Sequence, residues 1–407
     1  MRFTRHSLAL ATLAALACGT AAQAQISNDT VKIGVLTDMA GPYSGMGGAG
    51  SVVAAKMAID DCLKAECKGM KIEVVSADHQ NKADIAATRA REWLDRDGVD
   101  AIVDITNSAA ALAVQKLVRE KGGIAMYSGP ATTRLTDEDC AENGFHWMFD
   151  TYSSASGAAA ALTKNGDKSW YFVTVDYAFG HSLEKDASEM VKANGGTVVG
   201  SVRHPLNASD FSSFILQAQN SKAQVIGLAN GAQDTVNAIK AAREFGITGD
   251  KGTKVASLLM FLTDVHSLGL RQAQGLMFSE GFYWDMDDQT RAFAARFEKL
   301  HKGFKPTMVQ AGVYSSTLHY LKSVAAAKTD DSKVIAQKMR ELPIDDPIMR
   351  NASIRPDGRV IHDMYLFQVK APKESKGAWD YYKTVSTIPA DTAFKPLAQS
   401  ACPLVKQ

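Results

Sequence analysis

VKIGVL, residues 31–36, is the first of several short apolar runs that alternate with longer alanine-rich stretches. Three similar runs follow it: KIEVVSAD (71–78), AIVDI (101–105) and GIAMYS (123–128). The stretches between them, 51–64, 82–97 and 109–121, have a helical composition. Runs that are apolar without alternation are typical of strands that helices cover on both faces. The pattern therefore predicts a doubly wound α/β fold with a parallel central sheet.

A second cycle of the same kind begins at residue 169. Its apolar runs are SWYFVTVD (169–176), TVVGSVRHP (197–205), AQVIGLAN (223–230), KVASLLMF (254–261) and GLMFSEGFYW (275–284), and its helical stretches are 180–194, 210–220 and 232–245. Two cycles predict two Rossmann-like lobes. The tail is helical over 287–303 and 307–326 and then β-rich around MYLFQVK (364–370). This tail would let the chain return to the first lobe, so we predict lobe 1 as 25–150 and 283–352, and lobe 2 as 151–282 and 353–407.

Residues 1–24 have the three-part pattern of a secretory signal peptide. The basic start MRFTRH is followed by the apolar run SLALATLAALACG and by small residues that suit cleavage after Ala24. We therefore predict export to the periplasm. A rival route is open, because the residues before Cys18 loosely resemble a lipobox, in which that cysteine would be acylated and would tether the protein to a membrane.

The composition is that of an ordinary globular protein. The 407 residues are 46% hydrophobic and 22% charged, with a formal net charge of +1. This length usually divides into two lobes or domains. A nearly neutral chain gives no reason to expect nucleic acid or a membrane surface as a partner.

Four cysteines would remain after cleavage: Cys62, Cys67, Cys140 and Cys402. An oxidising compartment would be expected to pair them, and three pairings are possible. The closeness of Cys62 and Cys67 favours a local pair, which leaves Cys140–Cys402. Neither a Cys-x-x-Cys motif nor a nearby pair of histidines occurs, so we predict no metal site.

The run GMGGAG (45–50) has the form G-x-G-x-x-G, and Asp78 ends the next strand, so a dinucleotide site must be considered. In that fold the first glycine follows the strand directly, whereas residues 37–44 intervene here. An exported protein also meets little nicotinamide cofactor. We therefore predict no cofactor, and a glycine-rich loop whose amides and helix N-terminus face a ligand cleft.

Polar loops follow the other predicted strands, where open α/β sheets bind ligands. In the first lobe, Thr106–Ser108 and the loop from Gly129 to Thr133 are rich in hydroxyls that could bind a carboxylate. Each loop could equally serve only to cap a helix. In the second lobe the corresponding loops are 176–180, 230–234 and 263–264, which could give aromatic walls and hydrogen bonds.

Catalytic motifs are missing from the sequence. There is no G-x-S-x-G elbow, no H-E-x-x-H and no Walker loop, and His79, His181, His266 and His362 have no metal-ligand spacing. We therefore predict that the protein is not an enzyme.

Several segments resemble the periplasmic solute-binding proteins of ABC transporters, in the leucine/isoleucine/valine-binding group. They are VKIGVLTDMAGPYSGMG (31–47), TNSAAALAV (106–114), YSGPATTRLT (127–136), VDYAFGHSLE (175–184) and residues 211–247. The resemblance covers essentially the whole mature chain. It implies a type I periplasmic binding protein, in which three crossings between the lobes form a hinge and the lobes close on one small solute, which is then delivered to a permease.

The resemblance also implies where the solute binds. The family's carboxylate contacts fall on the loops with Ser108 and Thr132 and near Met46, whereas the family's tyrosines and acidic ammonium partner match this chain poorly. Aromatic side chains could instead stack on a ring. The predicted ligand-binding residues are Tyr43, Met46, Asn107, Ser108, Ser128, Thr132, Asp176, Tyr177, Phe179, Asn230, Asp264 and Trp284.

We accordingly expect a monomeric binding protein for an amino acid, an amide or an aromatic carboxylate, with ABC permease subunits as partners. Two alternatives are open. One is a ligand-sensing module that reports to a membrane receptor, and the other is an exported α/β enzyme.

Overall fold

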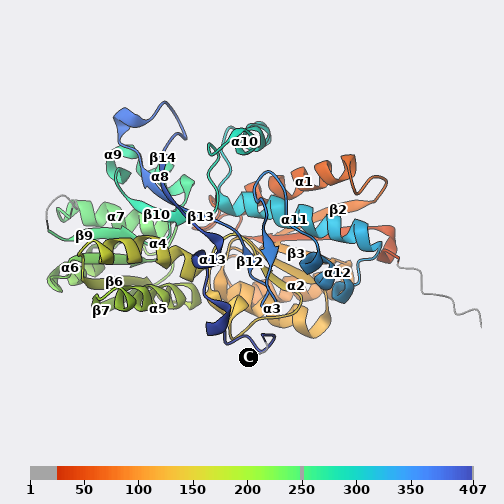
Figure 1. Cartoon of the computed structure of the whole chain (residues 1–407), viewed down its shortest axis with the longest axis horizontal. Coiled ribbons are helices and arrows are strands. Elements are labelled where there is room, and N and C mark those ends of the chain that lie inside the picture. Colours follow the sequence, from red (N-terminus) through yellow and green to blue (C-terminus); the bar gives the residue numbers. More distant parts are fainter. Residues whose placement is uncertain (1–24, 248–251, 406–407) are drawn as a thin grey trace, which may run out of the picture.

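The computed structural model describes residues 25–247 and 252–405, which form two α/β lobes side by side (Figure 1). The predicted signal peptide, residues 1–24, lies outside the described residues, and so does Cys18. The first sheet is parallel throughout, in the order β2-β1-β3-β4-β5. Its strands are β1 (Val31–Thr37), β2 (Ile72–Asp78), β3 (Ala101–Asp104), β4 (Ile124–Tyr127) and β5 (Gly144–His146).

Helices cover both faces of the first sheet. Along β1, Ile33 and Val35 belong to one core cluster and Leu36 to another, because neighbouring side chains of a strand point to opposite faces. The first cluster includes α1 (Gly48–Lys64) and α11 (Met308–Ala327), which pack on each other. The second includes α2 (Ala83–Glu92), the π-helical turn η2 (Trp93–Asp97) and α3 (Ser108–Lys121). The tail therefore returns to lobe 1, and it adds α10 (Asp288–Leu300) and α12 (Ser332–Glu341) there.

The second lobe repeats the plan with a parallel sheet in the order β7-β6-β8-β9. Its strands are β6 (Ser169–Val175), β7 (Thr197–His204), β8 (Val225–Ala229) and β9 (Lys254–Ser257). Its helices are α4 (Thr151–Lys164), α5 (Ala178–Ala193), α6 (Ser212–Asn220), α7 (Gln233–Glu244), α8 (Leu262–Leu268) and α9 (Leu270–Ala273). The predicted doubly wound fold with two parallel sheets is confirmed.

A smaller antiparallel sheet joins the second lobe to the tail. It has the order β10-β13-β14, with β10 (Met277–Glu280), β13 (Met364–Val369) and β14 (Tyr382–Ile388). The remaining elements are the hairpin β11 (Ser353–Ile354) and β12 (Val360–Ile361), α13 (Ala390–Ala393), and the short turns η1 (Ser27–Asp29), η3 (Thr133–Thr136), η4 (Pro372–Glu374) and η5 (Leu397–Gln399). The run 275–284, expected to continue the parallel cycle, therefore pairs with the tail instead.

A buried arginine holds the crossings between the lobes together. The guanidinium of Arg359, which has no exposed surface, donates to the carbonyls of Trp147 at 2.7 Å and Phe149 at 3.1 Å. The ring of His362 bonds the carbonyl of Met148 at 2.7 Å. Gly281 lies against both His362 and Met148, so the crossings near 149, 282 and 362 pack side by side.

We predict the segment 353–407 as part of lobe 2, and its described residues, 353–405, contact both lobes. β13 and β14 belong to the sheet with β10, but Arg359 makes an isolated β-bridge with His146, the last residue of β5. Cys402 is bonded to Cys140 of lobe 1, and the other disulfide is Cys62–Cys67. These are the two pairs that the sequence favours.

Candidate functional site

A narrow pocket lies between the lobes, and its walls come from loops at the carboxyl ends of strands in both parallel sheets. The lining residues are Tyr43, Met46, Thr106, Ser108, Gly129, Ala131, Tyr177, Phe179, Gly231, Leu259 and Phe261. The enclosed volume is about 10 Å³, close to the minimum that holds one water molecule. A solute larger than water therefore fits only if the walls of the pocket move apart.

The glycine-rich loop is shaped by Asp38, at the end of the first strand. Its carboxylate accepts from the backbone amides of Gly41 and Tyr43 at 2.7 and 2.9 Å, and from the side chain of Asn81 at 2.6 Å. A Cβ atom on Gly47 would lie 2.6 Å from the Thr106 methyl group, so only glycine fits there. These contacts place Tyr43 and Met46 in the pocket.

The floor of the pocket covers a buried acid, Asp104. A Cβ atom on Gly129 would lie 2.6 Å from its Oδ1, and one on Gly47 would lie 2.9 Å from its Oδ2. Burial raises the pKa of Asp104 to about 7, although the side chains of Ser51 and Thr37 favour its ionised form. The first lobe therefore holds a carboxyl group that is partly protonated near neutral pH directly beneath the site.

The two lobes touch across the pocket through hydroxyl groups. Tyr43 of lobe 1 and Tyr177 of lobe 2 meet with their hydroxyl oxygens 2.6 Å apart. Thr132 meets Ser182 in the same way at 2.7 Å, and the hydroxyl of Thr133 donates to Asp186 at 3.3 Å. These contacts exist only while the lobes are together, so the structure is a closed arrangement.

The pocket is lined by neutral groups. Among the described residues that line it, none carries a formal charge; the polar groups are the hydroxyls of Tyr43, Thr106, Ser108 and Tyr177 and backbone amides. The Oγ of Ser108 accepts from the amides of Ala131 and Thr132, both at 3.3 Å, which leaves its own hydrogen free to donate. Hydroxyls and amides of this kind can bind a carboxylate, and Phe179 and Phe261 can contact a ring.

Five predicted ligand residues line this pocket: Tyr43, Met46, Ser108, Tyr177 and Phe179. Thr132 lies beside it and meets the second lobe, and Asp264 lies at the neighbouring opening of the cleft, which Met46 also borders. The carboxylate of Asp264 accepts from the Phe261 amide at 2.9 Å, and burial raises its pKa to about 7. The ligand roles of these seven residues stay predictions.

Five others lie outside the lining; four of them have a local hydrogen-bond partner instead, and the fifth, Ser128, is buried without a partner for its hydroxyl. Asn107 caps α3 by accepting from the amides of Ala109 and Ala110. Asn230 bonds His204 and Thr235 in the core of lobe 2, and Asp176 pairs with His181 on the surface. The indole of Trp284 donates to the Trp379 carbonyl, which turns it away from the pocket, and buried Ser128 packs against Gly312 of α11.

The sequence did not single out Leu259 and Phe261. The run 254–261 was expected to be strand to its end, but β9 stops at Ser257, so these residues belong to the loop that borders the pocket. The missed residues Thr106, Gly129, Ala131 and Gly231 lie within or beside polar loops that the sequence did identify. Over residues 25–247 and 252–405, no group of three or more His, Cys, Asp or Glu side chains is placed to hold a metal ion.

Two lobes of one design, a hinge between them and a closed pocket at the strand ends define a binding protein of the hinged type. The periplasmic binding protein family model matches residues 30–378, and the chain belongs to this family. Within the described part of the chain, no helix is both long and apolar enough to span a membrane.

Two solved structures are similar over nearly the whole chain. A periplasmic binding protein from Burkholderia mallei is 50% identical, with a TM-score of 0.90, over 93% of this chain and 100% of that one. A branched chain amino acid ABC transporter periplasmic ligand-binding protein from Burkholderia xenovorans is 41% identical, with a TM-score of 0.82, over 92% and 100%. A Leu/Ile/Val-binding protein homolog of Brucella melitensis is 24% identical, and the match spans 58% of this chain and 60% of that protein.

Proposed function

We propose that this protein is the periplasmic solute-binding component of an ABC importer and that its solute is a small aromatic carboxylate. The observation that carries the proposal is the neutral pocket, where tyrosine and serine hydroxyls and two phenylalanine rings meet between closing lobes. An α-amino acid also needs a partner for its ammonium group, and no described residue that lines the pocket is acidic. Two solute-binding proteins from Rhodopseudomonas palustris with this fold hold 4-hydroxybenzoate and benzoate, at 21% and 16% identity.

Transport explains the remaining features of the chain. We propose that residues 1–24 direct export and are removed after Ala24, that the protein acts as a monomer, and that it delivers its solute to permease subunits in the membrane. Closure would be a hinge motion driven by contacts that exist only when both lobes touch the solute. The sequence pattern of residues 1–24 supports export, and the hydroxyl contacts across the cleft support closure.

Thermal unfolding with a panel of solutes tests the proposal. We expect benzoate or 4-hydroxybenzoate to raise the melting temperature and leucine to leave it unchanged. Binding to the folded state alone adds about 2.7 kcal/mol of stability when the solute is at 100 times its Kd. Stabilisation by leucine but not by the aromatic acids would contradict the proposed class of solute, and no response to any member would count against solute binding.

Removing one hydroxyl of the closing contact should weaken binding. Tyr177→Phe keeps the ring but loses the 2.6 Å contact with Tyr43. We expect the Kd for 4-hydroxybenzoate, measured by calorimetry, to rise roughly two- to tenfold, because one hydrogen bond contributes about 0.5–1.5 kcal/mol. The control is Tyr171→Phe on β6, outside the pocket. An equal change in both variants would show that the cross-cleft contact has no special role.

A further inference from the structure

The last part of the chain, residues 389–402, connects the lobes a further time, and we name it the C-terminal strap. It leaves β14 directly after Ile388, which pairs with Met364 in the sheet of lobe 2. It ends at Cys402, which is bonded to Cys140 in lobe 1. The far end of the strap is therefore attached to lobe 1 by a disulfide. At the crossings near 149, 282 and 362, in contrast, the backbone itself passes from one lobe to the other.

The middle of the strap packs on the hinge. Phe394 is buried, and the guanidinium carbon of Arg359 lies 4.2 Å from the centre of its ring. The ring of His362 lies 5.2 Å from the same ring. The amide of Ala390 donates to Asp363 at 2.9 Å. The strap therefore contacts the same two side chains, Arg359 and His362, that hold the crossings together.

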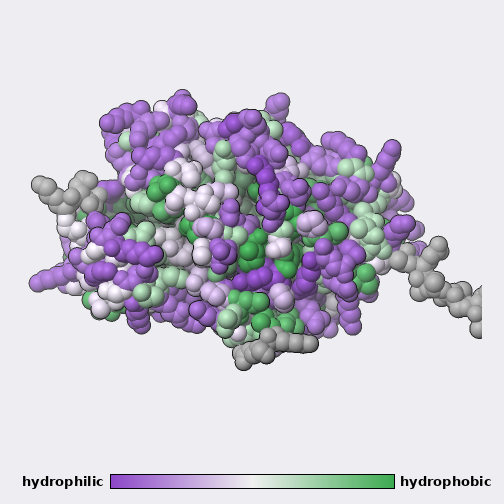
Figure 2. Space-filling view, in the orientation of Figure 1, coloured by the Kyte–Doolittle hydropathy of each residue, from purple (hydrophilic) through white to green (hydrophobic). Residues whose placement is uncertain are grey.

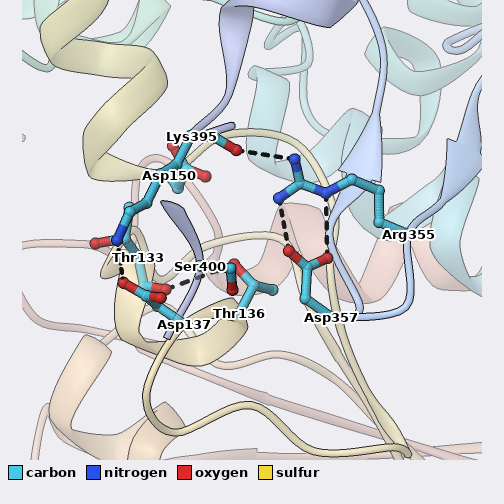
Figure 3. A pocket seen from close by; sticks show the side chains of 8 residues that line it. All are labelled: Thr133, Thr136, Asp137, Asp150, Arg355, Asp357, Lys395 and Ser400. Carbon is cyan, nitrogen blue, oxygen red and sulfur yellow. Dashed lines mark hydrogen bonds and ion pairs between the residues drawn. The ribbon is translucent and has the colours of Figure 1, made fainter. Parts of the chain in front are cut away.

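Beyond the hinge, polar contacts dock the strap on lobe 1. Asp137 accepts from the ammonium group of Lys395 at 2.5 Å, and Arg355, paired with Asp357, donates to the Lys395 carbonyl at 2.9 Å (Figure 3). Asp137 also accepts from the amide of Ala401. The Asp137 side chain is only 8% exposed, so the carboxylate of this ion pair is largely shielded from solvent. In Figure 1 the strap, drawn in dark blue, runs from the middle of the molecule to the first lobe.

The docking point is next to the solute site. Asp137 and Cys140 follow η3, and the residues that begin this turn, Thr132 and Thr133, make the contacts to Ser182 and Asp186 of lobe 2. The strap thus holds the segment of lobe 1 that meets the other lobe on closure.

On the face shown in Figure 2 the surface is mostly hydrophilic, and hydrophobic residues show mainly along the middle, where the lobes meet.

We propose that the C-terminal strap is a disulfide-closed tether that limits how far the lobes separate and so biases the solute-free protein toward the closed arrangement. Only five residues, 389–393, join the end of β14 to the buried Phe394, and at most about 3.6 Å of chain length per residue is available to them. Wide opening would therefore pull Phe394 and Lys395 from their sites. The inference rests on the proposed function only where solute binding is measured. The separation of the lobes can be measured without any solute.

The test lengthens the strap and keeps both disulfides. Six residues, Gly-Ser-Gly-Ser-Gly-Ser, are inserted between Pro389 and Ala390, within the five-residue segment that joins β14 to Phe394; Pro389 is exposed. The matched control carries the same insertion between Gly377 and Ala378, an exposed turn of lobe 2. Small-angle X-ray scattering of the solute-free proteins gives the radius of gyration. We expect an increase for the strap insertion and none for the control, with unchanged circular dichroism in both.

Binding gives a second measurement, with 4-hydroxybenzoate as the probe. If the fraction of solute-free protein in the closed, binding-competent arrangement falls from about one half to about one tenth, the apparent Kd rises about fivefold. Lys395→Met, which removes the ion pair without changing the chain length, should shift the radius and the Kd in the same direction. An unchanged radius of gyration in the strap insertion would overturn the proposal. A larger radius in a protein that binds no solute would support the tether and count against the proposed function.

Discussion

Replacing Cys140 and Cys402 together with serine is expected to lower the free energy of unfolding by about 5 kcal/mol, whereas replacing Cys62 and Cys67 should cost about 2 kcal/mol. The bonded residues are 262 positions apart in the first pair and 5 in the second. A cross-link stabilises mainly by restricting the unfolded chain, and the restriction grows with the length of the closed loop. Urea unfolding of the two double variants, at equal pH and without reductant, measures both losses.

The local pair is the matched control, because both of its cysteines are buried and it belongs to lobe 1 alone. Equal losses in the two variants would show that loop length does not set the contribution of the long disulfide. A larger loss for Cys62–Cys67 would contradict the prediction outright.

The second large effect concerns Asp104. Its pKa is about 7 in the folded protein because of burial, and about 3.9 in an unfolded chain. The folded state therefore holds the proton more tightly, and the wild-type protein loses stability as the pH rises from about 4 to about 7. Asp104→Asn removes this loss, so the stability of the variant relative to wild type should rise over that range by up to about 4 kcal/mol.

Urea unfolding of both proteins at intervals between pH 4 and pH 8 measures this difference directly. Comparing each variant with wild type at the same pH cancels the titration of the other buried groups, among them His79, whose pKa is lowered to about 4 by burial. The control is Asp345→Asn, at an exposed position. If the difference in unfolding free energy between Asp104→Asn and wild type stays constant with pH, the raised pKa of Asp104 is contradicted.

The sequence predicts the layered parts of the fold well. Unbroken apolar runs such as 33–36 and 225–229 lie in buried strands of parallel sheets, because a strand covered on both faces needs no polar alternation. The run 275–284 is equally apolar, yet β10 pairs antiparallel with β13, almost 90 residues later in the chain. The partner of a strand depends on where the chain returns, and a local pattern contains no information on that.

The same limit applies to the pocket. Loops at strand ends can be identified in the sequence, and Tyr43, Ser108 and Tyr177 follow from that rule. The direction of a side chain depends on distant neighbours: Trp284 points away because the carbonyl of Trp379 accepts its hydrogen bond. The contact between Tyr43 and Tyr177 depends on how two lobes are oriented, which no spacing within either lobe specifies.

The way Arg359 binds the crossings has a consequence for how the lobes move. One rigid, planar group is bonded to two carbonyls of the same crossing strand, at Trp147 and Phe149, and is shut off from water. Because the crossings near 149, 282 and 362 pack side by side around this group, the lobes can turn about them, but sliding past each other would break bonds that no solvent could replace. We therefore expect opening and closing to be close to a pure rotation, which returns each hydroxyl of one lobe to the same partner on the other in every cycle.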